Sequence, residues 1–308
     1  MSKKIALEPK QFGPYLEAIV ESGGTVADLA NDVEALIWTD YARPDLLEKA
    51  LESNPQLRWV QLPFAGVDAF SSIIGRYRSI TFTSAKRSYS EPVAEHALML
   101  CMALGRVLPE RIRAKSWGQK FADSLFDEEL LIVGGGGIAQ QLVDLLEPYR
   151  TRVTVIRKRP SESFTNTDFS KVLGFDSLSQ ELAKAKFVVL ACALTDETRF
   201  LFDSKLFSTM RKDSYLVNVA RGEVVNQEDL VQALQQGQIS GAATDVTYPE
   251  PLPEGHPMWD VENLIITPHT ADTMPIVTRL FAQRLRENVA AYISGEKLVG
   301  LVDAELGY

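Results

Sequence analysis

The sequence predicts an α/β protein of two Rossmann-like or flavodoxin-like domains, each with a parallel sheet, and a cleft between them. Three observations predict this fold. Short apolar runs alternate with amphipathic stretches along the whole chain. The 308 residues exceed what a single hydrophobic core usually holds. A glycine-rich turn separates an apolar run from a helical pattern near the middle of the chain.

The first third of the chain alternates between strand and helix patterns. A first strand lies within residues 1–7, and two more are Ala35–Trp38 and Trp59–Leu62. Between the last two, residues 44–53 form a helix because their apolar side chains share one face. A longer helix begins at Ser90 as its N-cap, and its broad apolar surface favours a position between the two domains.

A second alternation begins at Leu130. Its clearest helix covers 227–236, with Asn226 as N-cap and Gly237 as the stop signal, and a last helix covers about 275–294. The expected strands of this half are 130–133, 152–156, 187–191, 215–219, 240–244 and 263–266.

We therefore expect a substrate domain formed by residues 1–100 and completed by 286–308. Residues 101–285 are expected to form a dinucleotide-binding Rossmann domain.

Composition narrows the class of protein. The net charge of −9 disfavours general nucleic-acid binding, because an acidic surface repels the phosphate backbone. Cys101 and Cys192 form neither a C-x-x-C pair nor part of a zinc-ligand set, so we expect two reduced, buried thiols and no metal; a disulfide is the less favoured alternative. We expect a cytoplasmic protein, because there is no secretory leader pattern and no run of about 18 apolar residues for a membrane span.

The glycine-rich turn follows the strand candidate 130–133 and precedes a helical pattern. Gly134-x-Gly136-x-x-Ala139 fits the dinucleotide fingerprint G-x-G-x-x-G/A. The first glycine permits the tight turn, the second lets the backbone approach the pyrophosphate, and the small third residue allows close packing. The helix N-terminus then offers N–H groups to the phosphates. A flexible loop is the alternative, and the flanking strand and helix favour nucleotide binding.

The second strand of this half ends in Arg157, Lys158 and Arg159. An NAD site usually carries an acidic residue here to bind the ribose 2′-hydroxyl, whereas arginine pairs with the 2′-phosphate of NADP. The sequence therefore predicts that NADP(H) is preferred and NAD(H) is possible, and a solvated basic turn is the alternative interpretation.

Polar residues follow three later strand candidates: Arg221, Glu250 with nearby Asp245, and His269. Ligands of open α/β sheets bind at the carboxyl ends of the strands. Arginine suits the carboxylate and carbonyl oxygen of a 2-oxo acid, and histidine suits the proton transfer that accompanies hydride transfer. A neighbouring carboxylate orients the ring and favours its protonated form. Taken singly, the three are a surface cation, a proline-loop carboxylate and a packing residue; their joint occurrence favours catalysis.

From about residue 57 to the C-terminus, the chain resembles the D-isomer-specific 2-hydroxyacid dehydrogenase family. Asn218–Gly222 is similar to the family's arginine signature, Asp245 with Glu250–Leu252 to its glutamate segment, and Thr267–Ala271 to its histidine segment. Glu91–His96 resembles the start of its interdomain helix, and Phe64–Asp68 its substrate loop. Ala139 and Ala193 depart from the usual glycine and proline.

The resemblance implies roles for these positions, a homodimer, and an active site in a cleft that closes on the cofactor. It assigns catalysis to Arg221, Glu250 and His269, and it assigns substrate binding to Ala65, Gly66, Arg221 and His269. The basic turn resembles that of NADPH-preferring members such as glyoxylate/hydroxypyruvate reductases. The implied cofactor contacts are Gly134, Gly136, Gly137, Ile138, Arg157, Lys158, Arg159, Val219, Ala220, Arg221 and Asp245.

Two functions follow. The first is an NAD(P)-dependent oxidoreductase that transfers a hydride between nicotinamide and a 2-oxo acid or D-2-hydroxy acid. The alternative is a non-enzymatic dinucleotide-sensing interaction protein on the same fold, which the complete catalytic set disfavours. The particular acid stays open, although the substrate loop lacks a cationic cluster for a phosphorylated substrate. Residues proposed to shape the pocket are Phe64, Phe70, Tyr89, Trp117 and Met274.

Overall fold

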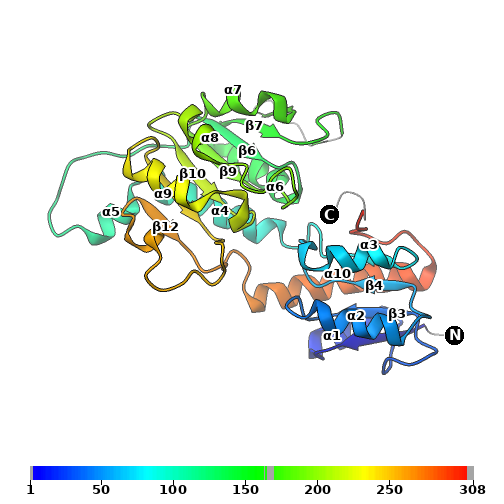
Figure 1. The fold of residues 1–308 in the computed structure, drawn as a ribbon. Helices are drawn as coiled ribbons and strands as arrows, with labels where there is room; N and C mark the ends of the chain where they lie inside the picture. Colours follow the sequence, from blue (N-terminus) through cyan, green and yellow to red (C-terminus); the bar gives the residue numbers. More distant parts are fainter. Residues whose placement is uncertain (1–2, 163, 165–169, 304–308) are drawn as a thin grey trace. The chain divides into compact units, whose positions relative to one another are not determined.

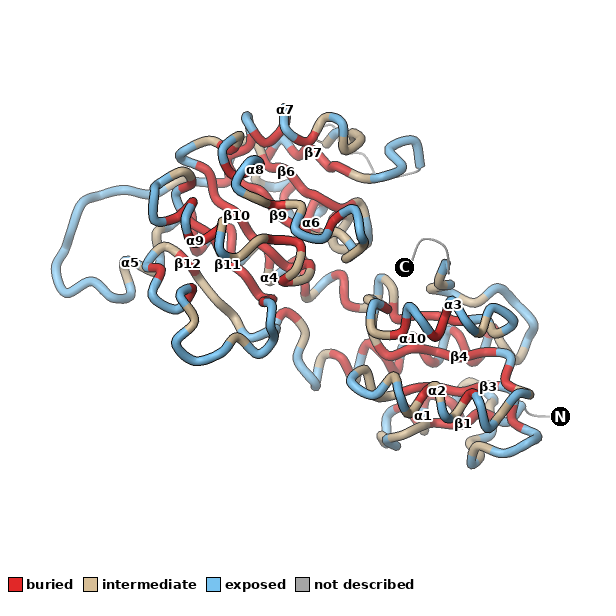
Figure 2. The backbone as a smooth tube through the Cα atoms, in the orientation of Figure 1, coloured by how far each residue is buried: buried red, intermediate tan, exposed pale blue. Residues whose placement is uncertain are grey.

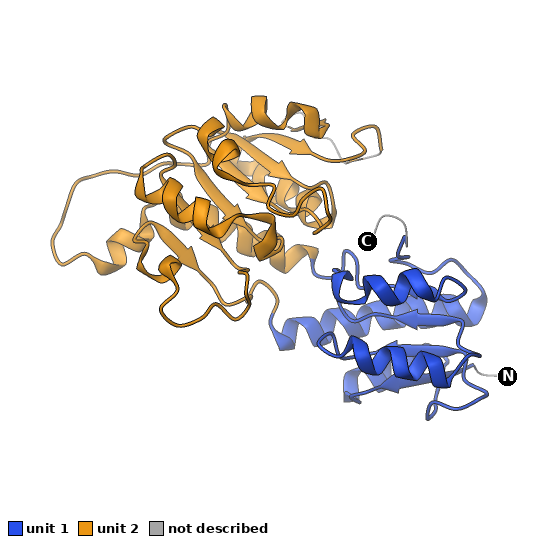
Figure 3. Ribbon diagram, viewed as in Figure 1, with its two compact units in different colours: residues 1–89, 273–308 blue, residues 90–272 orange. Residues whose placement is uncertain are grey.

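The computed structural model describes residues 3–162, 164 and 170–303, which form two compact units (Figures 1 and 3). Unit 1 consists of the chain up to Tyr89 and from Thr273 onward, and unit 2 is Ser90–Asp272. The sequence placed these limits near residues 100 and 285 instead. They differ because two helices each belong whole to one unit: α4 (Ser90–Gly105) packs on α6 (Gly137–Leu146), and α10 (Met274–Ser294) packs on α1 (Gly13–Glu21).

Unit 1 is built around a five-stranded parallel sheet in the order β2-β1-β3-β4-β5, which is the flavodoxin-like order. All four residues of β3 are buried, as expected for a central strand covered on both faces. The strands are β1 (Lys4–Glu8), β2 (Thr25–Val26), β3 (Ala35–Trp38), β4 (Trp59–Gln61) and β5 (Thr81–Thr83). The helices are α1, α2 (Pro44–Ser53), η1 (Asp68–Phe70), α3 (Ser71–Arg76) and α10.

Unit 2 is built around a seven-stranded parallel sheet in the order β12-β11-β10-β9-β6-β7-β8. This is the Rossmann order extended by one strand, and it reverses between β6 and β9. Figure 2 shows that the central strands of this sheet are buried. The strands are β6 (Glu129–Val133), β7 (Arg152–Ile156), β8 (Ser170–Leu173), β9 (Phe187–Leu190), β10 (Tyr215–Asn218), β11 (Gly241–Thr244) and β12 (Leu264–Ile266).

Helices connect the strands of unit 2, as the alternation of the sequence predicts, and α4 contacts β10 and β11 of the sheet. Besides α4 and α6, they are α5 (Leu108–Arg113), η2 (Glu147–Tyr149), η3 (Phe175–Ser177), α7 (Leu178–Leu182), α8 (Ser204–Thr209), η4 (Gly222–Val224), α9 (Gln227–Gln235) and η5 (Pro257–Asp260).

Local signals place the helix ends. The side chain of Asn226 accepts a hydrogen bond from the Asp229 N–H at 3.2 Å and caps α9. Gly237 follows α9 with φ +62°, and Gly295 ends α10 with φ +76°. Both glycines adopt the left-handed conformation that terminates a helix, as the sequence predicted.

Two further expectations concern the cysteines and the membrane. Both cysteines are free; Cys101 is buried as expected, whereas the residue Cys192 is partly exposed. Burial raises the pKa of each thiol to about 12, which leaves both as poor nucleophiles. Within the described part of the chain, no helix combines the length and apolar character that crossing a membrane requires.

Candidate active site

The glycine-rich turn lies at the point where the strand order of unit 2 reverses. Gly134 follows β6 with φ +113°, and a Cβ built on it would come within 2.5 Å of the carbonyl group of Ala191, just after β9. Only glycine fits here, because the turns after β6 and β9 are in contact. Ligands of such sheets bind at this switch point.

Above the turn, the backbone leaves room for a ligand. Gly136 is the N-cap of α6, and a Cβ on it would meet no heavy atom of the described residues within 4 Å. Gly137 and Ile138 open the helix, so their N–H groups belong to its unpaired first turn. Ala139 is fully buried, and it takes the close-packing role of the fingerprint's last glycine.

The three cations after β7 are paired with carboxylates whose positions were not predicted from the sequence. Glu162 contacts the guanidinium groups of Arg157 and Arg159, each at 2.8 Å. Lys158 pairs with Glu197 at 2.8 Å. The cations therefore gather at the end of β7 as predicted, but each already has an anionic neighbour.

Arg221 is held in a turn that follows β10. The buried Asn218 accepts a hydrogen bond from the Ala220 N–H and donates one to the Arg221 carbonyl oxygen, both at 3.0 Å. A Cβ on Gly222 would come within 2.1 Å of the Thr247 carbonyl carbon. The glycine after Arg221 thus lets the arginine turn pack directly on the loop that carries Glu250.

The predicted catalytic pair is formed. Nδ1 of His269 lies 2.6 Å from Oε1 of Glu250, and both side chains are a little over two-fifths exposed. The hydrogen bond that His269 makes to the Glu250 carboxylate raises the pKa of His269 above its usual 6.5, outweighing the lowering effects of burial and Arg221. The same bond lowers the pKa of Glu250. The pair therefore favours the imidazolium–carboxylate state, with Arg221 near enough to influence both groups.

Asp245 organises the loop that carries His269. Its carboxylate, 2% exposed, accepts hydrogen bonds from the Thr267 hydroxyl at 2.6 Å and from the N–H groups of Thr270 and Ala271 at 2.9 and 3.0 Å. Nε2 of His96, on α4, lies 3.3 Å from the same carboxylate. These contacts lower the pKa of Asp245 against the effect of burial.

Within this loop, His269 has a positive φ of +52°, an uncommon backbone conformation for a residue other than glycine. Its N–H donates to the Asp245 carbonyl oxygen at 2.8 Å. The network thus holds the histidine in a conformation that needs support from its surroundings. His96, which belongs to the segment resembling the start of the interdomain helix, also takes part in this network through its contact with Asp245.

The predicted substrate loop belongs to unit 1, whereas Arg221, Glu250 and His269 belong to unit 2. Ala65 and Gly66 follow β4, beside Phe64, whose ring lies 5.6 Å from Tyr41 and 5.9 Å from Tyr89. The Tyr89 hydroxyl donates to the Pro63 carbonyl oxygen at 2.7 Å. An aromatic cluster therefore supports the loop from within the same unit.

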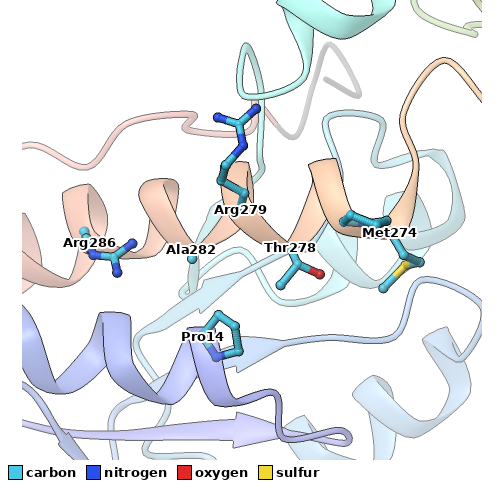
Figure 4. A pocket seen from close by; sticks show the side chains of 7 residues that line it. Pro14, Met274, Thr278, Arg279, Ala282 and Arg286 are labelled. Atoms are coloured by element: carbon cyan, nitrogen blue, oxygen red, sulfur yellow. The ribbon is translucent and has the colours of Figure 1, made fainter.

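A groove of about 550 Å³ lies in unit 1, between α1 and the first half of α10 (Figure 4). Pro14, Met274, Thr278, Arg279 and Arg286 are among its lining residues, so Met274 lines a surface other than the predicted substrate loop. Among the described residues, no group of three or more His, Cys, Asp and Glu is arranged to hold a metal ion.

Comparisons with known proteins identify a family to which the chain is similar. Residues 96–271 match the family described as D-isomer specific 2-hydroxyacid dehydrogenase, NAD binding domain. A glyoxylate reductase/hydroxypyruvate reductase of Mus musculus is 31% identical over 267 residues, which are 82% of this chain and 80% of the mouse protein.

Two solved structures share the fold along their whole length. A D-isomer specific 2-hydroxyacid dehydrogenase from Xanthobacter autotrophicus Py2, in complex with NADPH and MES, is 24% identical with a TM-score of 0.85 over 100% of both chains. An NADPH-dependent glyoxylate/hydroxypyruvate reductase from Sinorhizobium meliloti, in complex with NADP and sulfate, is 22% identical with a TM-score of 0.84 over 100% of both chains.

Proposed function

The chain belongs to the D-isomer specific 2-hydroxyacid dehydrogenase family, and on that premise we propose that it reduces a small 2-oxo acid to the D-2-hydroxy acid, or catalyses the reverse. The observation that supports this most is the contact of His269 Nδ1 with Glu250 Oε1 at 2.6 Å. The turn of Arg221 packs against the loop of Glu250, because Gly222 has no side chain. A histidine whose pKa is raised by a carboxylate, close to an arginine, is suited to a reaction that needs both a proton and an anion clamp.

Each side chain has a distinct task in this proposal. The nicotinamide, when bound, supplies or accepts the hydride. Arg221 binds the substrate carboxylate and polarises the carbonyl oxygen. His269 donates a proton to that oxygen through Nε2, because Nδ1 faces Glu250. Glu250 fixes the ring orientation and keeps the imidazolium stable, and in the oxidation direction the neutral histidine accepts the proton instead.

For the cofactor we propose NADP(H) as the preferred form. Arg157 and Arg159 lie after β7, where the adenosine ribose is bound in this fold, and guanidinium groups pair well with a phosphate monoester. The residues proposed to contact the cofactor are Gly134, Gly136, Gly137, Ile138, Arg157, Lys158, Arg159, Val219, Ala220, Arg221 and Asp245.

For the substrate we propose glyoxylate or hydroxypyruvate, because the mouse relative carries the name glyoxylate reductase/hydroxypyruvate reductase. The backbone amides of Ala65 and Gly66, together with Arg221, are proposed to receive the carboxylate.

We also propose a homodimer assembled through unit 2. Figure 2 shows the segment that follows α5 exposed along its length, and Trp117 within it is 89% exposed. Ile112 on α5, Phe121 on the segment that follows it, and Met99 and Met102 on α4 are also exposed. Helices α4 and α5 are in contact, and exposed large apolar side chains on neighbouring elements are typical of a surface covered by another chain. Sedimentation equilibrium should give a dimer, and Trp117→Ser should weaken it; a monomeric wild type would contradict this part of the proposal.

The activity is tested by following the absorbance of NADPH and NADH with purified protein and a panel of 2-oxo acids. We expect turnover with glyoxylate or hydroxypyruvate, faster at low cofactor concentration with NADPH, and a D-configured product from hydroxypyruvate. Cofactor binding without turnover of any acid would instead support the non-enzymatic sensing function.

A further inference from the structure

Glu162 occupies the centre of the basic turn. Its Oε2 lies 2.8 Å from Nη2 of Arg157, and its Oε1 lies 2.8 Å from Nη1 of Arg159. One carboxylate thus bridges the two guanidinium groups that we propose for the 2′-phosphate. The backbone supports this arrangement, because the Glu162 N–H donates to the Arg159 carbonyl oxygen at 3.2 Å.

Arg157 is the fixed member of the three. Its side chain is only 15% exposed, and a Cβ built on Gly135 would come within 2.7 Å of its Cδ. The arginine stem therefore packs on the glycine-rich turn itself, and a larger residue at position 135 would displace it. Arg159 and Glu162 are 48% and 42% exposed, so these two side chains have room to move while Arg157 stays in place.

A carboxylate and a phosphate monoester use the same guanidinium N–H groups. When both are present beside Arg157 and Arg159, they compete, and their negative charges repel each other. NAD(H) carries an uncharged hydroxyl at the ribose 2′ position, so its binding leaves the bridge intact. Glu162 thus acts differently on the two cofactors.

We propose that Glu162 is a cofactor-specificity residue: it is a built-in occupant of the 2′-phosphate position that NADP(H) must displace and NAD(H) does not. This inference rests on the proposed dinucleotide site. It follows that the preference of the wild-type protein for NADP(H) is smaller than its arginines alone would give. Removing the carboxylate charge sharpens that preference.

The experiment compares wild type, Glu162→Gln and a matched control. The control is Glu129→Gln, because Glu129 pairs with Arg152 at 2.7 Å at the other end of the same strand, β7. Kd values for NADPH, NADH and 2′,5′-ADP are measured by calorimetry at low ionic strength, with 5′-AMP as the probe that lacks the phosphate. Both substitutions remove one exposed carboxylate charge and keep the side-chain size.

For Glu162→Gln we expect NADPH and 2′,5′-ADP to bind about 3- to 10-fold more tightly, which is the range for losing two exposed ion pairs. The Kd values of Glu162→Gln for NADH and 5′-AMP should stay within about two-fold of wild type. In Glu129→Gln, the Kd values for all four ligands should stay within about two-fold of wild type. Glu162→Asp, too short to bridge both arginines, should fall between wild type and Glu162→Gln.

An unchanged ratio of NADPH to NADH affinity in Glu162→Gln, with a wild type that binds NADPH, would overturn the inference and leave the proposed function intact. Equal tightening in Glu129→Gln would also overturn it, since the effect would then be one of net charge. A wild type that binds neither dinucleotide would overturn the proposed function together with this inference.

Discussion

The basic turn and the proposed catalytic loop, which carries His269, both depend on charged side chains of unit 2, but they hold those charges in opposite ways. At the basic turn, Glu162 and Glu197 are 42% and 67% exposed, and two of their three partners, Arg159 and Lys158, are about half exposed. At the loop that carries His269, the supporting Asp245 is 2% exposed and accepts hydrogen bonds from backbone and side chains at once. Exposed ion pairs exchange readily, whereas buried hydrogen bonds are expensive to break.

The difference between exposed ion pairs and buried hydrogen bonds suits two proposed tasks of unit 2, the choice of cofactor and proton transfer. Choice of cofactor needs groups that can change partners when a phosphate arrives. Proton transfer needs a histidine whose ring stays in one place, and the buried Asp245 supports the backbone of His269. Substitutions at the two regions should therefore act on different measurable quantities, binding in one case and turnover in the other.

Among the substitutions that compare the two regions, Arg221→Gln should have the largest effect, because it removes the anion clamp and the polarising charge; only the loss of the proton donor His269, considered last, should cost more. We expect kcat/KM for the 2-oxo acid to fall about 10²- to 10³-fold, because one lost donor to a developing oxyanion typically costs that much. The Kd for NADPH should change far less, since Arg157 and Arg159 are untouched. If the affinity for NADPH fell by as large a factor as kcat/KM, the two regions would not differ in acting on binding and on turnover.

Arg157→Met should produce the converse pattern. The Kd for NADPH should rise about 10- to 100-fold, as expected for losing charge-assisted hydrogen bonds, while kcat at saturating NADPH stays near wild type. The methionine keeps the apolar stem that packs on Gly135. Titration of NADPH and NADH checks this, and an equal loss for both would place Arg157 in a role unrelated to the 2′-phosphate.

Asp245→Asn tests whether the buried network is needed for the catalytic loop. The asparagine side chain would place an NH₂ group where one carboxylate oxygen of Asp245 now accepts hydrogen bonds, so a buried donor would lose its acceptor. We therefore expect the free energy of unfolding to fall by about 1–3 kcal/mol. Chemical denaturation measures this, and kcat should fall as His269 loses its support. Full stability and full turnover together would show that the loop holds its shape without the carboxylate.

The mildest test is the pH dependence of Glu250→Gln. Reduction requires protonated His269, so kcat/KM should fall as pH rises through the pKa of His269, which Glu250 raises above 6.5. Removing the carboxylate lowers that pKa, and the decline should move to lower pH. A pH–rate profile from pH 5 to pH 10 checks this, and an unmoved profile would disconnect Glu250 from the histidine.

Much of the fold was predictable because apolar periodicity and glycine positions are local signals. The predicted strands from 130–133 to 263–266 are present, with ends shifted by no more than a residue or two. Three strands were missed: β2 has two residues, β5 places one phenylalanine between threonines, and β8 is a partly exposed edge strand. None of these gives a clear apolar run.

In the site, the predictable part was the identity of polar residues at strand ends. The pairing of His269 with Glu250 was predicted from their chemistry, and the structure shows it. The bridge through Glu162 was not, because a glutamate five residues after Arg157 resembles any exposed acidic residue. The contact of His96 with Asp245 joins residues far apart in sequence, and only tertiary packing brings them together. The one sequence signal for this contact was the presence of a histidine within an otherwise apolar helix.

The most direct test of the proton-transfer claim compares wild type with His269→Asn, using NADPH and the best acid of the panel. Turnover and NADPH affinity are measured on the same preparations. We predict a kcat/KM that is about 10²- to 10⁴-fold lower, with a Kd for NADPH within about two-fold of wild type. Turnover close to wild type in His269→Asn would contradict the assignment of His269 as the proton donor.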